Sequence, residues 1–314
     1  MKNVNKLTEG AILLAIFAVL ILITIYVPII GSFLNLLLPL PFILFSAKND
    51  LKLIGAFTIA AVFISFLAGS FLGISITLIY GITGIILGYL LQKNRSRTMI
   101  LIAGSLTFLA GTVIFYVVSA SFFHFDIIHE IKDAFKQSSA MSENMLKAMG
   151  KADQIETIKK QNEDTVKMIT TLAPSFMILA SIIIVMIIQW ICFPIAKRFG
   201  VQIQQWGNFR NLSLPKSLLW YFLIALGANF LFHPQDGTFL YTVIQNAVYI
   251  LEMFLMVQGL SFLLFMLYQK STPKGIGIII VLLAFTIPIV HYIIMLLGIT
   301  DLGFNFRKRF INKE

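Results

Sequence analysis

Nine apolar segments recur along this 314-residue chain, and they constrain its fold more than any other feature. The hydrocarbon core of a bilayer is about 30 Å thick, and roughly 20 apolar residues cross it as a helix. Segments 33–47 and 218–232 are the shortest of the nine. The sequence therefore predicts an all-α, polytopic integral membrane bundle of eight or nine hydrophobic segments. The segments are Gly10–Ile30, Phe33–Ala47, Leu53–Ala68, Phe71–Leu91, Met99–Ser121, Leu172–Pro194, Leu218–Phe232, Phe239–Tyr268 and Ile276–Leu297.

The amino-acid composition is typical of a chain that is embedded in a membrane. Hydrophobic residues make up 58% of the chain and charged residues only 12%, whereas about 25% of residues are charged in a soluble domain. This excludes a soluble enzyme, and it excludes intrinsic disorder, which needs low hydrophobicity and high charge. The single cysteine, Cys192, excludes an intramolecular disulfide.

Lysine and arginine gather in loops on one side of the predicted membrane. If all nine segments cross, the loops on the side of the amino terminus hold 13 basic residues, and the short loops at 28–32, 69–70 and 233–238 hold none. Cytoplasmic loops carry such an excess. We therefore expect a protein of the bacterial cytoplasmic membrane with a cytoplasmic amino terminus and no nucleic-acid partner. The basic residues are Lys2, Lys6, Lys48, Lys52, Lys93, Arg95, Arg97, Lys197, Arg198, Arg210, Lys216, Lys270 and Lys274.

The basic carboxy-terminal tail conflicts with nine full crossings, because nine crossings would place it outside. Three resolutions are open. The last segment does not cross fully, an earlier segment is not a span, or the tail departs from the charge rule. Pro288, inside the last apolar segment, makes a re-entrant final segment one of these alternatives.

The chain is expected to divide into four parts: a membrane half over 1–120, an extracytoplasmic insertion over 121–171, a second membrane half over 172–298 and a tail over 299–314. The polar insertion is predicted to be helical, because its apolar residues recur at helical spacing. Met141, Met145 and Met149 form an apolar stripe that either packs on the protein or membrane or docks a partner. His124 and His129 are five residues apart, and no neighbouring motif supports a metal site.

One acidic residue, Glu252, lies deep inside an apolar segment. Charged residues at such depth are expensive and are functional candidates. Gln245 and Tyr249 share its helical face, and Asn246 lies beside that face. Glu252 is either part of a substrate or proton site between helices or a buried carboxyl with a structural role. His291 reaches Glu252 if their helices pack together, although a lone membrane histidine is more often a structural hydrogen-bonder.

The tail alternates aromatic and basic residues. It either anchors at the membrane interface or forms a specific Asp301–Arg307 pair that locks the tail to the bundle. No phosphate-binding loop, zinc motif or nucleophile elbow occurs in the sequence. We therefore expect a protein that is not an enzyme and that needs no cofactor or metal.

Two short patterns resemble a known family. Asn246 followed by Gln258-Gly259-Leu260, and Gly298-x-x-Asp301 followed by Phe306-Arg307, are similar to the YybS-like family of uncharacterised bacterial multi-pass membrane proteins. The resemblance covers nearly the whole chain. It implies a class of protein, a multi-pass membrane protein, but no biochemical mechanism. An acidic residue usually precedes Phe-Arg in that family, whereas Asn305 stands here.

The first half also resembles the substrate-binding (S) components of energy-coupling-factor vitamin transporters. The resemblance rests on Thr8-Glu9-Gly10-Ala11, on Pro39-Leu40-Pro41 and on the glycine-rich fourth segment. In that family an Ala-x-x-x-Ala face of the first helix packs on the transmembrane coupling subunit, which implies this role for Ala11 and Ala15. The chain departs from the family by having about three further segments and the insertion.

Two functions follow as hypotheses. One is a small-molecule binding or transport subunit related to S components, which needs coupling-factor transmembrane and ATPase subunits as partners. The other is a non-catalytic membrane scaffold or interaction protein in envelope growth or sporulation, which binds another membrane protein through its insertion. A membrane enzyme is a more distant third.

Overall fold

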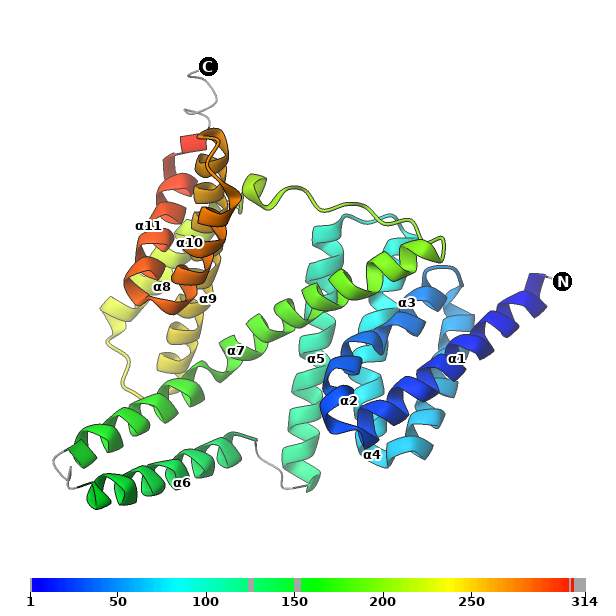
Figure 1. The fold of residues 1–314 in the computed structure, drawn as a ribbon, viewed down its shortest axis with the longest axis horizontal. Coiled ribbons are helices and arrows are strands. Elements are labelled where there is room, and N and C mark those ends of the chain that lie inside the picture. The colour runs from blue at the N-terminus through cyan, green and yellow to red at the C-terminus, as the bar shows by residue number, and fades with distance from the viewer. Residues whose placement is uncertain (1, 124–126, 150–153, 305, 308–314) are drawn as a thin grey trace. The chain divides into compact units, whose positions relative to one another are not determined.

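The computed structural model describes residues 2–123, 127–149, 154–304 and 306–307. All of its regular elements in these ranges are helices, so the predicted all-α class is confirmed (Figure 1). The chain forms two compact units. Unit 1 comprises Met1–Ala140 and Met177–Gln205, and unit 2 comprises Met141–Phe176 and Trp206–Glu314. The four parts expected from the sequence remain a prediction.

Unit 1 is a bundle of apolar helices around one core that includes Phe17, Phe42 and Ile188. Its first helix ends at Tyr26, because Pro28 starts a new one. The elements are α1 (Lys2–Tyr26), α2 (Pro28–Leu34), η1 (Asn35–Leu37), α3 (Pro39–Ser46), α4 (Leu51–Gln92), α5 (Arg97–Phe123) and the second part of α7 (Ile155–Arg198).

Helix α4 contains a reversal of the chain. Gly69 and Ser70 leave the helical conformation, and Ser70 has a φ of 49°. The side chains of Ser65 and Thr77 are hydrogen-bonded, although twelve residues of straight helix would separate them by about 18 Å. The two arms of α4 therefore lie side by side, and they correspond to the predicted segments 53–68 and 71–91.

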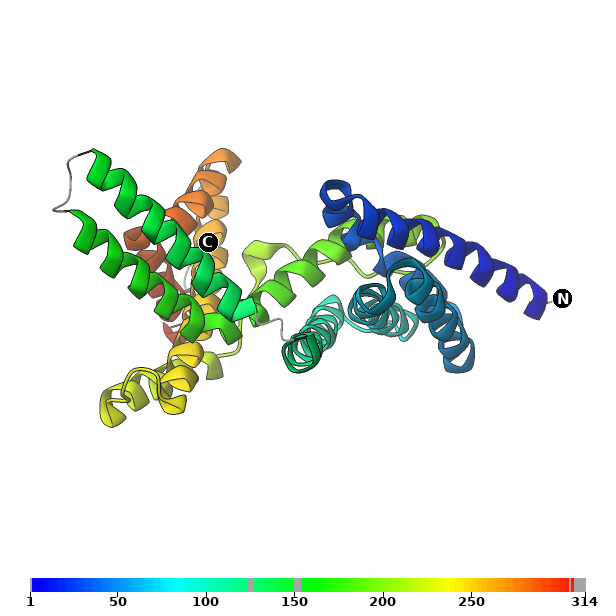
Figure 2. The same ribbon diagram turned by 90° about the horizontal axis from the view of Figure 1, so that it is seen from below.

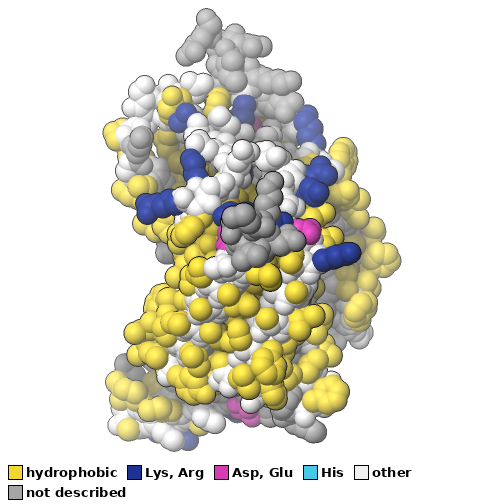
Figure 3. All heavy atoms as spheres, turned by 90° about the vertical axis from the view of Figure 1, so that its right-hand side faces the viewer, with side chains coloured by type: hydrophobic (Ala, Val, Ile, Leu, Met, Phe, Trp, Pro, Cys, Tyr) yellow, Lys and Arg dark blue, Asp and Glu magenta, His cyan; other side chains and the backbone are white. Residues whose placement is uncertain are grey.

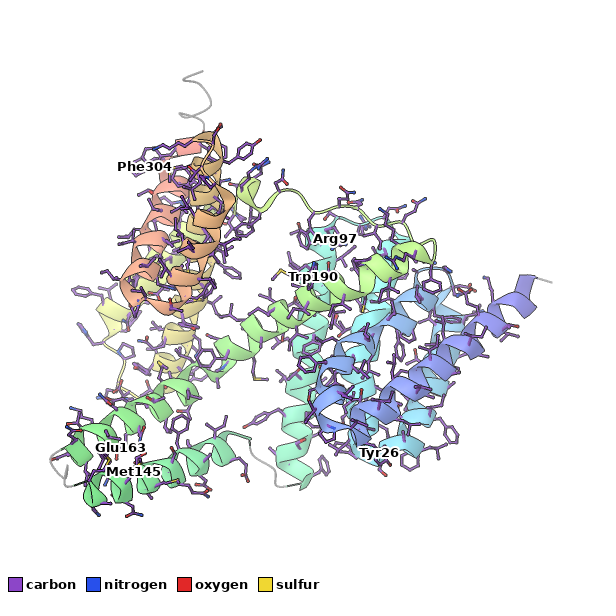
Figure 4. All side chains as sticks on the ribbon, in the orientation of Figure 1. Tyr26, Arg97, Met145, Glu163, Trp190 and Phe304 are labelled. Carbon is purple, nitrogen blue, oxygen red and sulfur yellow. The ribbon has the colours of Figure 1, made fainter. Side chains whose placement is uncertain are left out.

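The basic loops of unit 1 lie at one of its ends. Lys48 binds Glu9 at 2.9 Å, and Gln92 donates to the carbonyl of Asn49, so the start of α1, the α3–α4 loop and the end of α4 meet. Tyr26 donates to the carbonyl of Ala68 at the other end. Figure 4 shows Arg97 and Tyr26 at these opposite ends. Figure 3 shows lysines and arginines gathered along one end of a broad hydrophobic face.

Unit 2 packs four helices and receives part of the insertion. The insertion is helical where it is described, as predicted, and the unit 2 end of α6 runs beside the start of α7 in both ribbon views (Figures 1 and 2). Lys167 of α7 pairs with Asp236, just before α9, and this bond lowers the pKa of the Asp236 carboxyl. The elements are α6 (Ile127–Ala148), the first part of α7, η3 (Phe209–Asn211), α8 (Ser217–Phe232), α9 (Phe239–Gln269), α10 (Lys274–Thr286) and α11 (Pro288–Phe304).

Helices α9 and α11 touch backbone to backbone at two glycines. A Cβ atom on Gly259 would overlap the carbonyl oxygen of Ile294, and one on Gly298 would overlap that of Leu255. Small residues allow such close approach in membranes, where packing replaces the hydrophobic effect as the force between helices. This contact fixes the register of α11 along α9.

Helices α10 and α11 form a hairpin that returns to its starting end. The pair is bent by 111° at Ile287. Gly277 of α10 lies near Leu264, and Arg307, just after α11, bonds to Ser261. Both ends of the hairpin therefore lie near the carboxyl end of α9. A bend of this kind belongs either to a broken span or to a re-entrant segment, so the re-entrant final segment stays a prediction that this geometry favours.

The number of crossings remains partly a prediction. In the described residues six helices are long and apolar enough to cross a membrane, or up to seven if the bent α10–α11 pair is one span. That number includes α4 as a single helix, although its two arms lie side by side. The predicted eight or nine segments are therefore consistent with the fold without being established by it.

We predict that the Gly259→Ala substitution destabilises unit 2 by about 1–3 kcal/mol, because the new methyl group pushes α11 away from α9. Thermal unfolding followed by tryptophan fluorescence in one detergent measures the effect. Gly227→Ala is the matched control, because nothing lies within 4 Å of its Cβ position and alanine favours a helix. Equal midpoints for the two variants would contradict the close contact.

Candidate functional site

Asn246 joins α9 to α7 inside unit 2. Its side-chain oxygen accepts from the Ser175 backbone N–H at 2.9 Å and from the Ser175 hydroxyl at 2.6 Å. Its amide nitrogen donates to the carbonyls of Thr171 and Thr242, each at 2.7 Å. With every polar group of its side chain bonded, Asn246 acts here as a structural link between helices.

The predicted polar face of α9 contacts two neighbouring helices. Gln245 donates to Asn229 of α8 at 3.4 Å. Tyr249 packs edge-on against Phe176 of α7, with ring centroids 5.6 Å apart. Glu252, one turn further along, has no hydrogen-bond or ion-pair partner among the described residues. It is half-buried, and its carboxyl, like the Tyr249 hydroxyl, makes no hydrogen bond within the described part of the chain.

The break between α10 and α11 lies at the level of Glu252. Met253 and Met256, which follow Glu252 on α9, belong to one apolar cluster with Ala284 and Val290 from the two sides of the break. Pro288 has no N–H, so the carbonyl of Ala284 lacks the donor that a continuous helix would supply. An unpartnered carboxyl and an interrupted backbone therefore occur together, near the middle of α9.

His291 does not make the contact that the sequence analysis raised. Among the described residues its ring contacts Tyr292, with centroids 5.7 Å apart, and has no bond to Glu252. The backbone contact of Gly259 with Gly298 sets the position of α11 along α9, and sequence spacing alone does not give that position.

A second polar cluster, which we call the tail lock, surrounds Asp301 near the carboxyl end of α9. Asp301 is 4% exposed. One of its oxygens accepts from Gln258 at 2.7 Å and from Arg307 at 2.8 Å. The Asp301–Arg307 pair, one of the two interpretations of the tail, is therefore present. Phe306 stacks on Phe262, with centroids 6.4 Å apart.

The tail lock also holds the loop that enters unit 2. Arg307 donates to the carbonyl of Arg210 at 3.0 Å and to the Ser261 hydroxyl at 3.1 Å. Ser261 in turn donates to the carbonyls of Phe209 and Leu212, each at 2.8 Å. The cluster therefore ties the tail, the 206–214 loop and α9 together. Its satisfied bonds favour a structural role.

Sequence analysis placed Gln258 and Ser261 outside any candidate site. The signal for Gln258 was its position in the Gln258-Gly259-Leu260 pattern. Ser261 gave no signal, because its bonds depend on a loop about 50 positions earlier in the chain.

The predicted docking residues lie on exposed faces. Ala11 and Ala15 are exposed on α1, on the side away from the core residues Leu13 and Phe17. Met141, Met145 and Met149 of the insertion are 77%, 66% and 58% exposed; Figure 4 labels Met145 on α6. The side chains of His124 and His129 lie outside the described part of the chain. In the part that is described, no three potential metal ligands group together.

Several long apolar helices and polar groups buried between them define a multi-pass membrane protein. The family comparison gives the same class: residues 15–302 match the family model described as "Predicted membrane protein (DUF2232)". The chain therefore belongs to the DUF2232 family of predicted membrane proteins, and it is embedded in a membrane.

A relative covers almost the whole chain. The chain is 33% identical to "Uncharacterized protein YybS" of Bacillus subtilis (strain 168) over 312 residues, which is 98% of this chain and 99% of the relative. The predicted YybS-like resemblance is confirmed. No solved structure matches the chain, so the resemblance to S components remains a prediction.

We predict that Asp301→Asn or Arg307→Gln lowers the stability of unit 2 by about 3–5 kcal/mol, because each leaves the other charge buried without its partner. Thermal unfolding in detergent measures the effect. Asp50→Asn is the control: Asp50 pairs with Lys6, but its side chain is 67% exposed, and such pairs contribute about 0–1 kcal/mol. An effect of the Asp301 variant no larger than that of the control would contradict the tail lock.

Proposed function

We propose that this chain is a small-molecule binding or transport subunit of the bacterial cytoplasmic membrane, with its amino terminus in the cytoplasm. It performs no catalysis of its own. The proposed site is centred on Glu252, where the α10–α11 pair breaks against the middle of α9.

The unpartnered carboxyl of Glu252 carries this proposal. Four other polar side chains of α9, those of Gln245, Asn246, Gln258 and Ser261, each have a hydrogen-bond partner, whereas the Tyr249 hydroxyl beside Glu252 makes none among the described residues. An ionisable group inside a membrane is expensive, and such groups mark substrate and ion pathways. Transporters bind substrates and coupling ions near the bilayer midplane, where discontinuous helices expose backbone groups. Glu252 and the break at Ile287 together supply both features.

Two observations are compatible with a partnered transport system. The exposed face of α1 that contains Ala11 and Ala15 has the small residues that let another membrane helix approach closely. The sequence has no phosphate-binding loop, so energy for active transport would come from partner ATPase subunits, with a coupling subunit bound at this face.

We predict that Glu252→Gln weakens binding of the co-purifying small molecule or cation by about tenfold or more, because it removes the negative charge of the Glu252 carboxylate. The wild-type protein is extracted gently from its native membrane, and its bound molecules are identified by native mass spectrometry. Affinity is then measured for the identified molecule.

Glu163→Gln is the matched control, because it makes the same chemical change at an exposed position in the polar part of α7 (Figure 4). It should leave binding unchanged. Loss of binding without a change in the unfolding midpoint supports the site. An empty wild-type protein, or equal binding by both variants, would reject it.

A scaffold in envelope growth or sporulation is the second candidate, and the exposed methionines of α6 favour it. Methionine surfaces adapt to varied partners. A photo-crosslinker at Met145 would then capture one defined external protein, and deletion of 127–149 would abolish co-purification of that protein with the chain. Capture of such a partner by a wild-type protein that carries no small molecule would favour this function over transport.

A further inference from the structure

Unit 1 has an apolar groove between α1 and α3, with a volume of about 480 Å³. Ligand sites typically measure about 300–1,000 Å³. Ile12 and Ile16 of α1 form one wall, and Leu40 and Leu44 of α3 form the other. Ile12 and Ile16 remain 57% and 45% exposed. The groove is therefore a lengthwise apolar channel on the surface of a membrane-embedded bundle, and an apolar chain fits its chemistry.

One end of the groove is charged. Glu9 and Lys48 line it there and are paired at 2.9 Å, and the Lys6–Asp50 pair lies beside it. The same end of unit 1 also has Lys52 and the basic residues of the α4–α5 loop and of the end of α7. Basic residues outnumber acidic ones there: Lys6, Lys48, Lys52, Lys93, Arg95, Arg97, Lys197 and Arg198 against Glu9 and Asp50. The groove thus ends in an environment that attracts anions.

We propose that this groove binds an anionic phospholipid, with one acyl chain between α1 and α3 and the phosphate beside Lys48. The two requirements of an amphiphile, an apolar channel and a cationic end, are met in one site. Basic pockets between membrane helices bind anionic headgroups in this way, and each basic residue near a membrane surface strengthens the attraction. The site is in unit 1, and it does not involve Glu252.

Native mass spectrometry of the purified full-length chain tests the proposal. Delipidated protein is mixed with equal amounts of phosphatidylglycerol and phosphatidylcholine of the same acyl chains. We expect one retained phosphatidylglycerol per chain and about fivefold less phosphatidylcholine. Lys48→Gln should lower phosphatidylglycerol retention by about fivefold, whereas Glu9→Gln, which breaks the same ion pair but removes a negative charge, should preserve or increase it. Equal retention of the two lipids, or equal losses in the two variants, would overturn the proposal.

Filling the groove provides a second test. Ile12→Trp should displace the lipid, whereas Ile59→Trp, on an exposed position of α4 outside the groove, should not. A photo-crosslinker at Ile16 in native membranes should label phospholipid. Equal retention by the two tryptophan variants would contradict the site, and a protein adduct at Ile16 would assign the groove to a partner helix instead.

Discussion

Every backbone N–H and C=O group that enters a bilayer must find its hydrogen-bond partner inside the protein, and this requirement shapes both units. Helices satisfy it along almost the whole described chain. The reversal at Gly69–Ser70 lies at the end of unit 1 opposite its basic loops, beside Tyr26. The break at Ile287–Pro288 differs, because it lies against the middle of α9. This departure and the unpartnered Glu252 lie at the same level, and their coincidence is the reason to place a binding site there.

Each unit, taken by itself, has one end that is rich in basic residues. In unit 1 the loops rich in lysine and arginine meet at one end. In unit 2 the bent α10–α11 pair brings Arg307 to the end that holds Arg210, where Arg307 donates to the Arg210 carbonyl. At the other end of unit 2, Lys167 of the insertion pairs with Asp236 of the α8–α9 loop. Both of these segments were predicted to be extracytoplasmic. A re-entrant last segment would bring the tail into agreement with the charge rule, and this remains a prediction.

Local patterns predicted the helices well, because apolar length and the positions of proline and glycine act locally. The sequence predicted 53–68 and 71–91 as two separate segments, and they correspond to the two arms of α4. Pro288 marked the site of the bend. The tail lock was harder to predict, because it unites Gln258, Asp301 and the carbonyl of Arg210 from distant parts of the chain. Whether His291 reaches Glu252 could not be predicted for the same reason. The answer depends on the register of α11 along α9, which two glycines determine through backbone contact.

Cysteine accessibility in intact cells tests the membrane arrangement most directly. The native Cys192 is buried, so single cysteines introduced at Lys93, Gln161, Lys270 and Gly303 can be probed with a membrane-impermeant maleimide. We expect labelling of Gln161→Cys in intact cells, and labelling of the other three only after the membrane is permeabilised. Labelling of Gly303→Cys in intact cells, with Lys93→Cys still protected, would show that the last segment crosses the membrane and would contradict the re-entrant hairpin.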